Sequence, residues 1–339
     1  MKISDSAKYL GNFVTSRGGV RDTVEDRRNK GWGKVATIKG ILSEVDLGQN
    51  TVEVGLLLRK AILVNSLLFT AETWSGIREP DLVRLEQVDH ALISSLTSGH
   101  SKSPNEFAYL ETGSLKLRHI LTQNRLMYHH HILTQEDGET IKLIYEKQKI
   151  SPTKGDWYEL LLKDFDFIEE KIDDEKIKML TKDDYRKRIK MLVKKAALKY
   201  LNKEKDGHKK VKKIVYNSLK IQPYLTSKLF TKEERNLMYS LRSNCHPAKN
   251  NFKRMNKNNL LCSLGCQNIE DQIHIFTQCP KIKVSETGIC YENIFKDVTY
   301  QKETIELFLK VDKKRKYKIE NILQNNLLPG GDTARTRAD

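Results

Sequence analysis

Three cysteines and one histidine in the C-terminal third of the chain have the spacing of metal ligands. Cys262, Cys266, His274 and Cys279 follow the pattern C-x3-C-x7-H-x4-C. Two thiolates joined by a tight turn can reach one ion at about 2.3 Å, and the histidine and third cysteine can complete a tetrahedron. Because protein fills all four positions, the pattern predicts one structural Zn²⁺ with no open position for a catalytic water.

The residues around these ligands favour the same interpretation. Gly265 lies in the first turn, where a positive φ is often needed. A short helix would carry His274, with Asn268 as its N-cap. Cys279 is five positions further on, about 140° round an ideal helix, so the helix must unwind before it. Pro280 is placed to end that helix.

Two alternatives to this ligand set stay open. Buried thiols and a satisfied core histidine would give the same residues without a metal, since free cysteine is a common small buried residue. Cys245 with His246, upstream, or Cys290, downstream, could also substitute as ligands. The odd total of five cysteines argues against a disulfide framework and for a reducing, intracellular compartment.

The composition of the chain points to a polyanionic partner. Its 339 residues include 60 Lys plus Arg and 44 Asp plus Glu, a net charge of +16. Charged residues reach 31% and hydrophobic residues 38%, which favours amphipathic helices with wide charged faces over compact sheets. Because the sequence has no apolar run long enough to cross a bilayer, we expect no membrane partner.

The periodicity of the chain predicts a mainly α fold. Residues 7–20 alternate as a short β-hairpin. Apolar residues at spacings of three and four predict helices over 54–69, 79–96, 115–133 and 303–323. Successive helical residues are about 100° apart, so His129, His130 and His131 cannot share one direction, and we interpret them as a solvated helix end, with contact to a metal or a phosphate as the alternatives.

One segment concentrates positive charge. Residues 182–220 contain 15 Lys or Arg and four Asp or Glu, a net of +11. An apolar stripe through Tyr185, Ile189 and Val193 leaves the other side of a helix to lysine, which predicts contact with the phosphates of RNA or DNA. An ordinary solvated face is the alternative. The residues that we assign to nucleic-acid binding are Lys187, Arg188, Lys190, Lys194, Lys195, Lys199, Lys209, Lys210, Lys212 and Lys213.

The order of these features resembles the reverse transcriptases of non-LTR, LINE-type, site-specific retrotransposons. KYLGNFVTSRGG, with Tyr9, Leu10 and Gly11, is similar to their primer-grip hairpin. Residues 57–96 resemble their thumb helices, and the segments 107–133 and 154–167 resemble the connecting region of elements with a C-terminal CCHC knuckle. The four predicted metal ligands match that knuckle one for one.

The resemblance implies a fold of helical thumb and helical connector with a short N-terminal β-hairpin and a small zinc-knuckle lobe. Its implied division is a hairpin remnant of the palm over 1–20, a thumb-like domain over 21–150, a basic connector over 151–250, the CCHC knuckle over 251–300, a C-terminal helix over 301–328 and a disordered tail over 329–339. By the same resemblance we expect the protein in the nucleus.

Polymerases of this family use a palm aspartate pair that holds two Mg²⁺ ions. The two Asp-Asp pairs here, Asp173–Asp174 and Asp183–Asp184, lie in charged helical surroundings beyond the hairpin, so we expect no catalytic residues in this chain. The function expected is that of a fragment that holds RNA or a primer-template duplex without extending it. Alternatives are an incomplete gene model of a full RNA-directed DNA polymerase and a domesticated zinc-dependent protein-binding scaffold.

Overall fold

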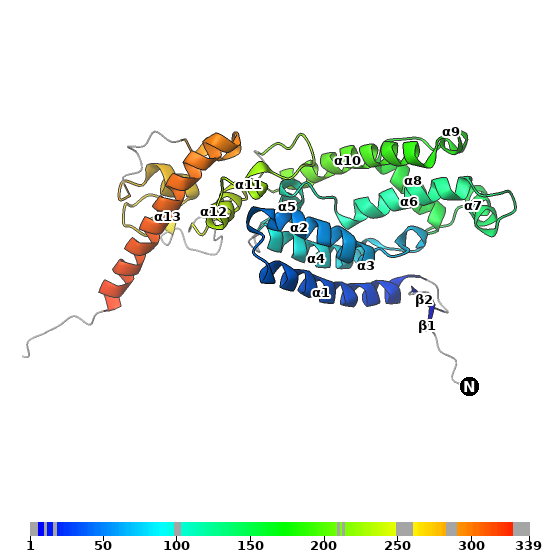
Figure 1. Ribbon diagram of the computed structural model, residues 1–339, viewed down its shortest axis with the longest axis horizontal. Helices are drawn as coiled ribbons and strands as arrows, with labels where there is room; N and C mark the ends of the chain where they lie inside the picture. Colours follow the sequence, from blue (N-terminus) through cyan, green and yellow to red (C-terminus); the bar gives the residue numbers. More distant parts are fainter. Residues whose placement is uncertain are drawn as a thin grey trace, which may run out of the picture. The chain divides into compact units, whose positions relative to one another are not determined.

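The structure is a computed structural model, and it describes residues 6–9, 12–15, 19–97, 103–208, 211, 214–248, 260–282 and 290–327. These residues are mainly helical, with 13 α-helices and one two-stranded hairpin (Figure 1). The prediction of a mainly α fold with a short N-terminal β-hairpin is therefore confirmed, whereas the assignment of the helices to a thumb and a connector stays a prediction. The chain divides into two compact units, Met1–Lys228 and Leu229–Asp339.

The first unit contains both strands and eleven of the described α-helices. They are β1 (Ser6–Tyr9), β2 (Asn12–Thr15), α1 (Arg21–Glu44), α2 (Thr51–Leu58), α3 (Asn65–Leu67), α4 (Glu79–Leu96), α5 (Asn105–Glu111), α6 (Leu117–Leu133), α7 (Thr140–Ile150), α8 (Trp157–Phe167), α9 (Asp174–Met179), α10 (Lys182–Asp206) and α11 (Pro223–Thr226). A π-helical segment, Arg59–Val64, makes α2 and α3 one continuous helical run.

The hairpin is fastened to helices of the first unit. Its strands are antiparallel, with Tyr9 opposite Asn12. The Asn12 amide donates to the Thr70 hydroxyl at 2.8 Å, and the Phe13 backbone N–H donates to the Thr23 hydroxyl at 2.8 Å. Among the described residues, no further strand joins this sheet. Tyr9 is exposed, whereas Leu10 and Gly11 lie outside the described residues, so the primer-grip assignment stays a prediction.

The first hydrophobic core lies where α1, α4 and the α2–α3 run meet (Figure 1). Leu63, Leu67, Val88 and Leu92 are all fully buried in it. Gly31 makes the close approach of α1 possible, because a Cβ at this position would lie 2.6 Å from Leu67 Cδ2. This close helix packing holds the middle of α1 against α3 and α4.

The second core, formed by α6, α7, α8, α9 and the first half of α10, contains two of the three consecutive histidines. His129 Nε2 lies 3.0 Å from the Tyr145 hydroxyl, and His130 Nε2 lies 3.0 Å from the Leu180 carbonyl oxygen. The interpretation of these residues as a solvated helix end is therefore wrong for His129 and His130. The interpretation holds for His131, which is exposed. His129 and His130 are buried because α7 and α9 pack over them.

The second unit contains α12 (Lys232–Arg242), a π-helical turn (His274–Gln278), a 3₁₀ helix (Tyr291–Phe295) and α13 (Val298–Leu327). Its core includes Phe276 and Phe308, whose ring centroids lie 4.8 Å apart. Lys302 of α13 bonds to Glu234 of α12 at 2.9 Å, which ties the two long helices together. None of the helices in the described part of the chain is both long and apolar enough to cross a membrane.

Candidate metal centre and basic helix

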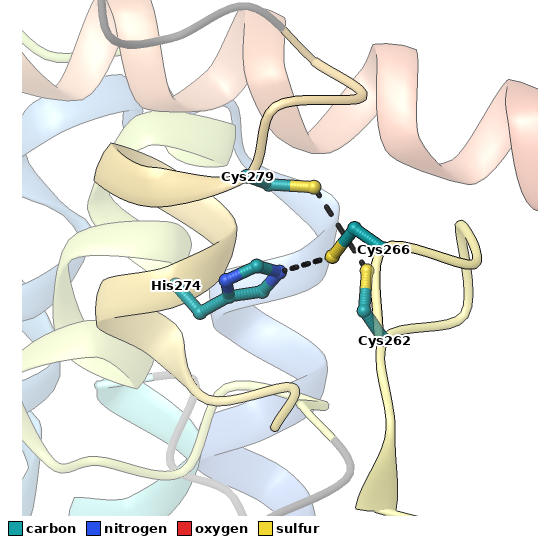
Figure 2. Close-up of side chains that lie close together, drawn as sticks. All are labelled: Cys262, Cys266, His274 and Cys279. Carbon is teal, nitrogen blue, oxygen red and sulfur yellow. Dashed lines mark hydrogen bonds between the residues drawn. The ribbon is translucent and has the colours of Figure 1, made fainter. Parts of the chain in front are cut away.

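The four predicted metal ligands converge in the second unit (Figure 2). Their ligand atoms all lie within 4.8 Å of one another. Cys262 Sγ is 3.8 Å from Cys279 Sγ, and Cys266 Sγ is 3.1 Å from His274 Nε2. Two sulfurs bound to one zinc ion at about 2.3 Å in a tetrahedron would lie about 3.8 Å apart. The cluster therefore has a ligand set and dimensions that could hold a metal ion such as zinc.

The first two cysteines are held by a tight loop. The Cys262 N–H donates to the Asn268 carbonyl at 2.7 Å, and the Gly265 N–H donates to the Cys262 carbonyl at 2.9 Å. Gly265 has a φ of +76°, which confirms the expected need for a left-handed residue in this turn. The Leu264 N–H lies 3.4 Å from Cys262 Sγ, where it can stabilise a thiolate.

A π-helical turn holds the other two ligands. The Asp271 carboxylate accepts the His274 N–H at 2.7 Å, so Asp271 caps this turn, and the assignment of Asn268 as the cap was wrong. His274–Gln278 is π-helical, and Cys279 follows in extended conformation. Because π-helical hydrogen bonds join residues five apart, His274 and Cys279 return to one side. The expected unwinding before Cys279 is confirmed.

Burial makes this site unfavourable for thiolates that lack a cation. It raises the pKa of the Cys262 thiol and raises the pKa of Cys279 to about 12, where the neighbouring thiolates add to the effect. At Cys266, burial acts to raise the pKa, but hydrogen bonds from the Asn268 backbone and the other two thiols lower it overall. A divalent cation would supply the charge that three converging thiolates require.

A buried ion pair supports the ligand loop. Glu270 is fully buried and accepts the Ser263 N–H at 2.7 Å and an N–H of Arg315 at 2.6 Å. Burial alone would raise the pKa of Glu270, but the hydrogen bonds from Ser263 and the Arg315 charge hold it below its ordinary value. The sequence pattern did not identify this pair, since its members are 45 positions apart.

The substitute ligands lie outside the cluster. Cys245 is buried, and His246 beside it lies 3.3 Å from Asp312 and packs against an aromatic ring. Cys290 is exposed and donates a hydrogen bond to the Glu292 carboxylate. None of the three belongs to the metal-competent group found among the described residues.

Helix α10 separates an apolar stripe from a lysine-rich face. Every fourth residue from Tyr185 through Ile189 to Leu201 is buried, so the opposite face is left to solvent. Arg188 pairs with Glu170 at 2.9 Å. The assigned residues on the exposed surface are Lys187, Arg188, Lys190, Lys194, Lys195 and Lys199, the last of which pairs with Glu169. Lys209, Lys210, Lys212 and Lys213 lie outside the described residues.

The two Asp-Asp pairs serve local structure. Asp173 caps α9 through the Lys176 N–H, and Asp174 accepts the Tyr145 hydroxyl at 2.8 Å. Asp183 pairs with Arg186 at 3.0 Å, and Asp184 accepts the Thr181 hydroxyl at 2.7 Å. Each carboxylate thus has a capping or ion-pairing partner from its own neighbourhood or from a helix packed against it.

Comparison with known proteins found no match for this chain. No protein-family model matches it, and neither a curated protein nor a solved structure is significantly similar to it. The arrangement of its own residues therefore carries the functional argument.

Proposed function

We propose that this protein binds RNA or DNA through the phosphate backbone and does not catalyse polymer synthesis. The observation that carries the proposal is the exposed face of α10, where four of the assigned lysines form no ion pair with a described residue. These four are Lys187, Lys190, Lys194 and Lys195. Their charges are available to an anionic partner, whereas Arg188 and Lys199 are already paired with glutamates.

The dimensions of this face suit a nucleic-acid backbone. The last of the four lysines is eight positions after the first, which corresponds to about 12 Å along the helix. A duplex carries one charge per about 1.7 Å of its axis, so a segment of this length presents several phosphates. Lysine is a flexible point charge without the bidentate geometry that reads bases, and this favours binding with little sequence preference.

The Cys3His cluster contributes the second part of the proposal, a structural Zn²⁺ that folds the second unit. Its support is the closed ligand set, the sulfur spacing and the buried thiols described above. The relationship to non-LTR reverse transcriptases, including a nuclear location, belongs to the same proposal and rests on the sequence motifs. The absence of synthesis is proposed because both Asp-Asp pairs serve as caps and ion-pair partners.

A binding assay at two salt concentrations tests the nucleic-acid proposal. Fluorescence anisotropy of a labelled duplex RNA, duplex DNA and RNA–DNA hybrid with the full chain should show binding that weakens strongly as salt is raised. Equal affinity at low and high salt would contradict phosphate binding. Primer extension with Mg²⁺ and nucleotides by the same protein would contradict the proposed absence of synthesis.

Metal analysis tests the zinc proposal independently. Protein purified without chelator should contain about one equivalent of zinc, because the site has a single set of four ligands. His274→Ala should lose most of that zinc, whereas His208→Ala, at an exposed histidine of the first unit, should keep it. Less than about half an equivalent in the unsubstituted protein would refute the site.

A further inference from the structure

A cavity of about 500 Å³ in the first unit is lined by aromatic, cationic and acidic side chains, the acidic ones being Glu79, Glu159 and Asp164. The loop before α4, the first turn of α4, the first half of α6, the loop before α8, α8 along its length and one residue of α10 surround it. Two glycines lie at its rim and connect the two loops, because the Gly76 N–H donates to the Gly155 carbonyl at 2.7 Å. Both glycines have a positive φ. Its volume lies within the range of small-molecule binding sites, which is about 300–1,000 Å³.

Two residues of the lining have buried polar atoms without a hydrogen-bond partner among the described residues, Arg125 at Nε and His119 at both ring nitrogens. His119 is 1% exposed, and neither of its ring nitrogens has a hydrogen-bond partner in the described part of the chain. Its ring stacks on Phe167 and meets Tyr200 edge to face, each with centroids 5.2 Å apart. A buried polar group without a partner opposes folding, so its presence beside a cavity calls for a ligand or water that completes its bonding.

The surroundings of His119 keep its imidazole neutral. Burial, reinforced by the charges of Arg118 and Lys116, lowers the pKa of His119 to about 3. A neutral imidazole has one donor and one acceptor nitrogen. Nucleobase edges present the same two kinds of group side by side.

We propose that this cavity binds a single nucleotide, with the base beside Phe167 and Tyr200 at His119 and the phosphate at Lys154, since Lys163 is paired with Glu159 at 2.9 Å. The aromatic lining suits a flat heterocycle, which stacks on such rings whatever its identity. Lys154 is exposed on the rim and forms no ion pair with a described residue, so its charge is available to a phosphate. The nucleotide could be free or could be an unpaired end of a strand.

The decisive variant is His119→Phe. Phenylalanine keeps an aromatic ring in the same place and removes both unpartnered nitrogens, so the protein should fold with equal or greater thermal stability. We expect its affinity for adenosine monophosphate, measured by calorimetry on the full chain, to fall at least tenfold. Ribose 5-phosphate, which lacks the base, should bind at least tenfold more weakly than the nucleotide to the unsubstituted protein.

Charge variants test the phosphate end. Lys154→Ala should weaken binding of adenosine monophosphate, and Lys39→Ala, an equal charge change at an exposed position of α1, should not. If His119→Phe leaves the affinity unchanged, or if ribose 5-phosphate binds as tightly as the nucleotide, the proposal is overturned. Absence of measurable binding by both the mononucleotide and a short single strand would overturn it as well.

Competition identifies the source of the nucleotide. A single strand that displaces adenosine monophosphate, when the same strand with an abasic end does not, would assign the cavity to strand ends. Displacement by neither strand would assign it to free nucleotides. The test is separable from the backbone-binding proposal, because replacing Lys187, Lys190, Lys194 and Lys195 should strongly weaken duplex binding and leave mononucleotide binding intact.

Discussion

Replacement of Lys187, Lys190, Lys194 and Lys195 of α10 by glutamine is the sharpest test of backbone binding. Glutamine keeps the length and helix propensity of the side chain and removes its charge. The substituted positions are exposed and lie opposite the buried stripe, so the fold should be retained. The quadruple variant is Lys187→Gln, Lys190→Gln, Lys194→Gln and Lys195→Gln.

The expected magnitude follows from counterion release. Each phosphate contact contributes about −0.9 to the slope of log affinity against log salt on duplex DNA, so four contacts give about −3.6. A fourfold increase in salt, from about 50 to about 200 mM, should therefore weaken binding of the unsubstituted protein about 150-fold. The quadruple variant should lose most of this slope and bind weakly at both concentrations.

The assay is anisotropy of a labelled duplex across a salt series, with circular dichroism to check that the variant is folded. The matched control removes four charges from other exposed lysines of the first unit. These are Lys34, Lys39, Lys60 and Lys147. Its slope should stay close to that of the unsubstituted protein. If both variants lose the same amount of the salt slope, binding depends on the net charge of the protein and not on the exposed face of α10. If the salt slope of the α10 variant is unchanged, the assignment of phosphate binding to α10 is refuted.

Three further outcomes test the fold. Zinc chelation should speed amide hydrogen exchange across residues 260–282 and leave α1 to α10 unchanged, because metal-binding energy is folding energy for the loop; equal exchange with and without chelator would contradict this. Arg315→Met should cost the second unit about 3–5 kcal/mol in urea unfolding at neutral pH, since Glu270 stays buried without its cation. Because the pKa of Glu270 is lowered on folding, its contribution is present at neutral pH and is lost as the pH falls below its ordinary value of 4.5, so the cost should shrink in acid. Gly113→Ala should lower the free energy of unfolding by more than about 2 kcal/mol, because φ at Gly113 is +62° and a Cβ would lie 2.5 Å from the backbone of Lys220. Gly40→Ala should raise the free energy of unfolding by about 1 kcal/mol, because Gly40 lies in α1 and a Cβ there would meet open space. Similar melting temperatures for the two glycine variants would refute that argument.

Features decided by neighbouring residues could be predicted from the sequence. The helix expected over 79–96 is α4, Glu79–Leu96, because Pro80 suits only the first turn and the apolar spacing persists to its end. The metal ligands were also predictable, since a tight turn and one helical turn fix their separation within 18 residues. Gly265 was predictable for the same reason, as the short loop needs a left-handed residue.

Features decided by distant partners could not be predicted. Nothing near His129 or His130 indicates that α7 and α9 will cover them, because Tyr145 and Leu180 lie 16 and 50 positions further on. The same holds for His119, whose lack of partners is visible only once α8 and α10 are packed around it. A lone histidine in an amphipathic pattern therefore has no predictable role until its covering helices are placed.

The zinc loop and α13 are coupled through Glu270. Its two oxygens bond to Ser263, next to the first ligand, and to Arg315 on α13, so the carboxylate bridges the loop and the helix. If the loop opens when zinc is removed, Arg315 loses its buried partner, and α13 is destabilised near its middle. Because the two effects are thermodynamically linked, Arg315→Met must weaken zinc binding by the same factor by which removal of zinc weakens the Glu270–Arg315 ion pair. Unchanged zinc affinity in that variant would mean that the loop folds around its metal without α13.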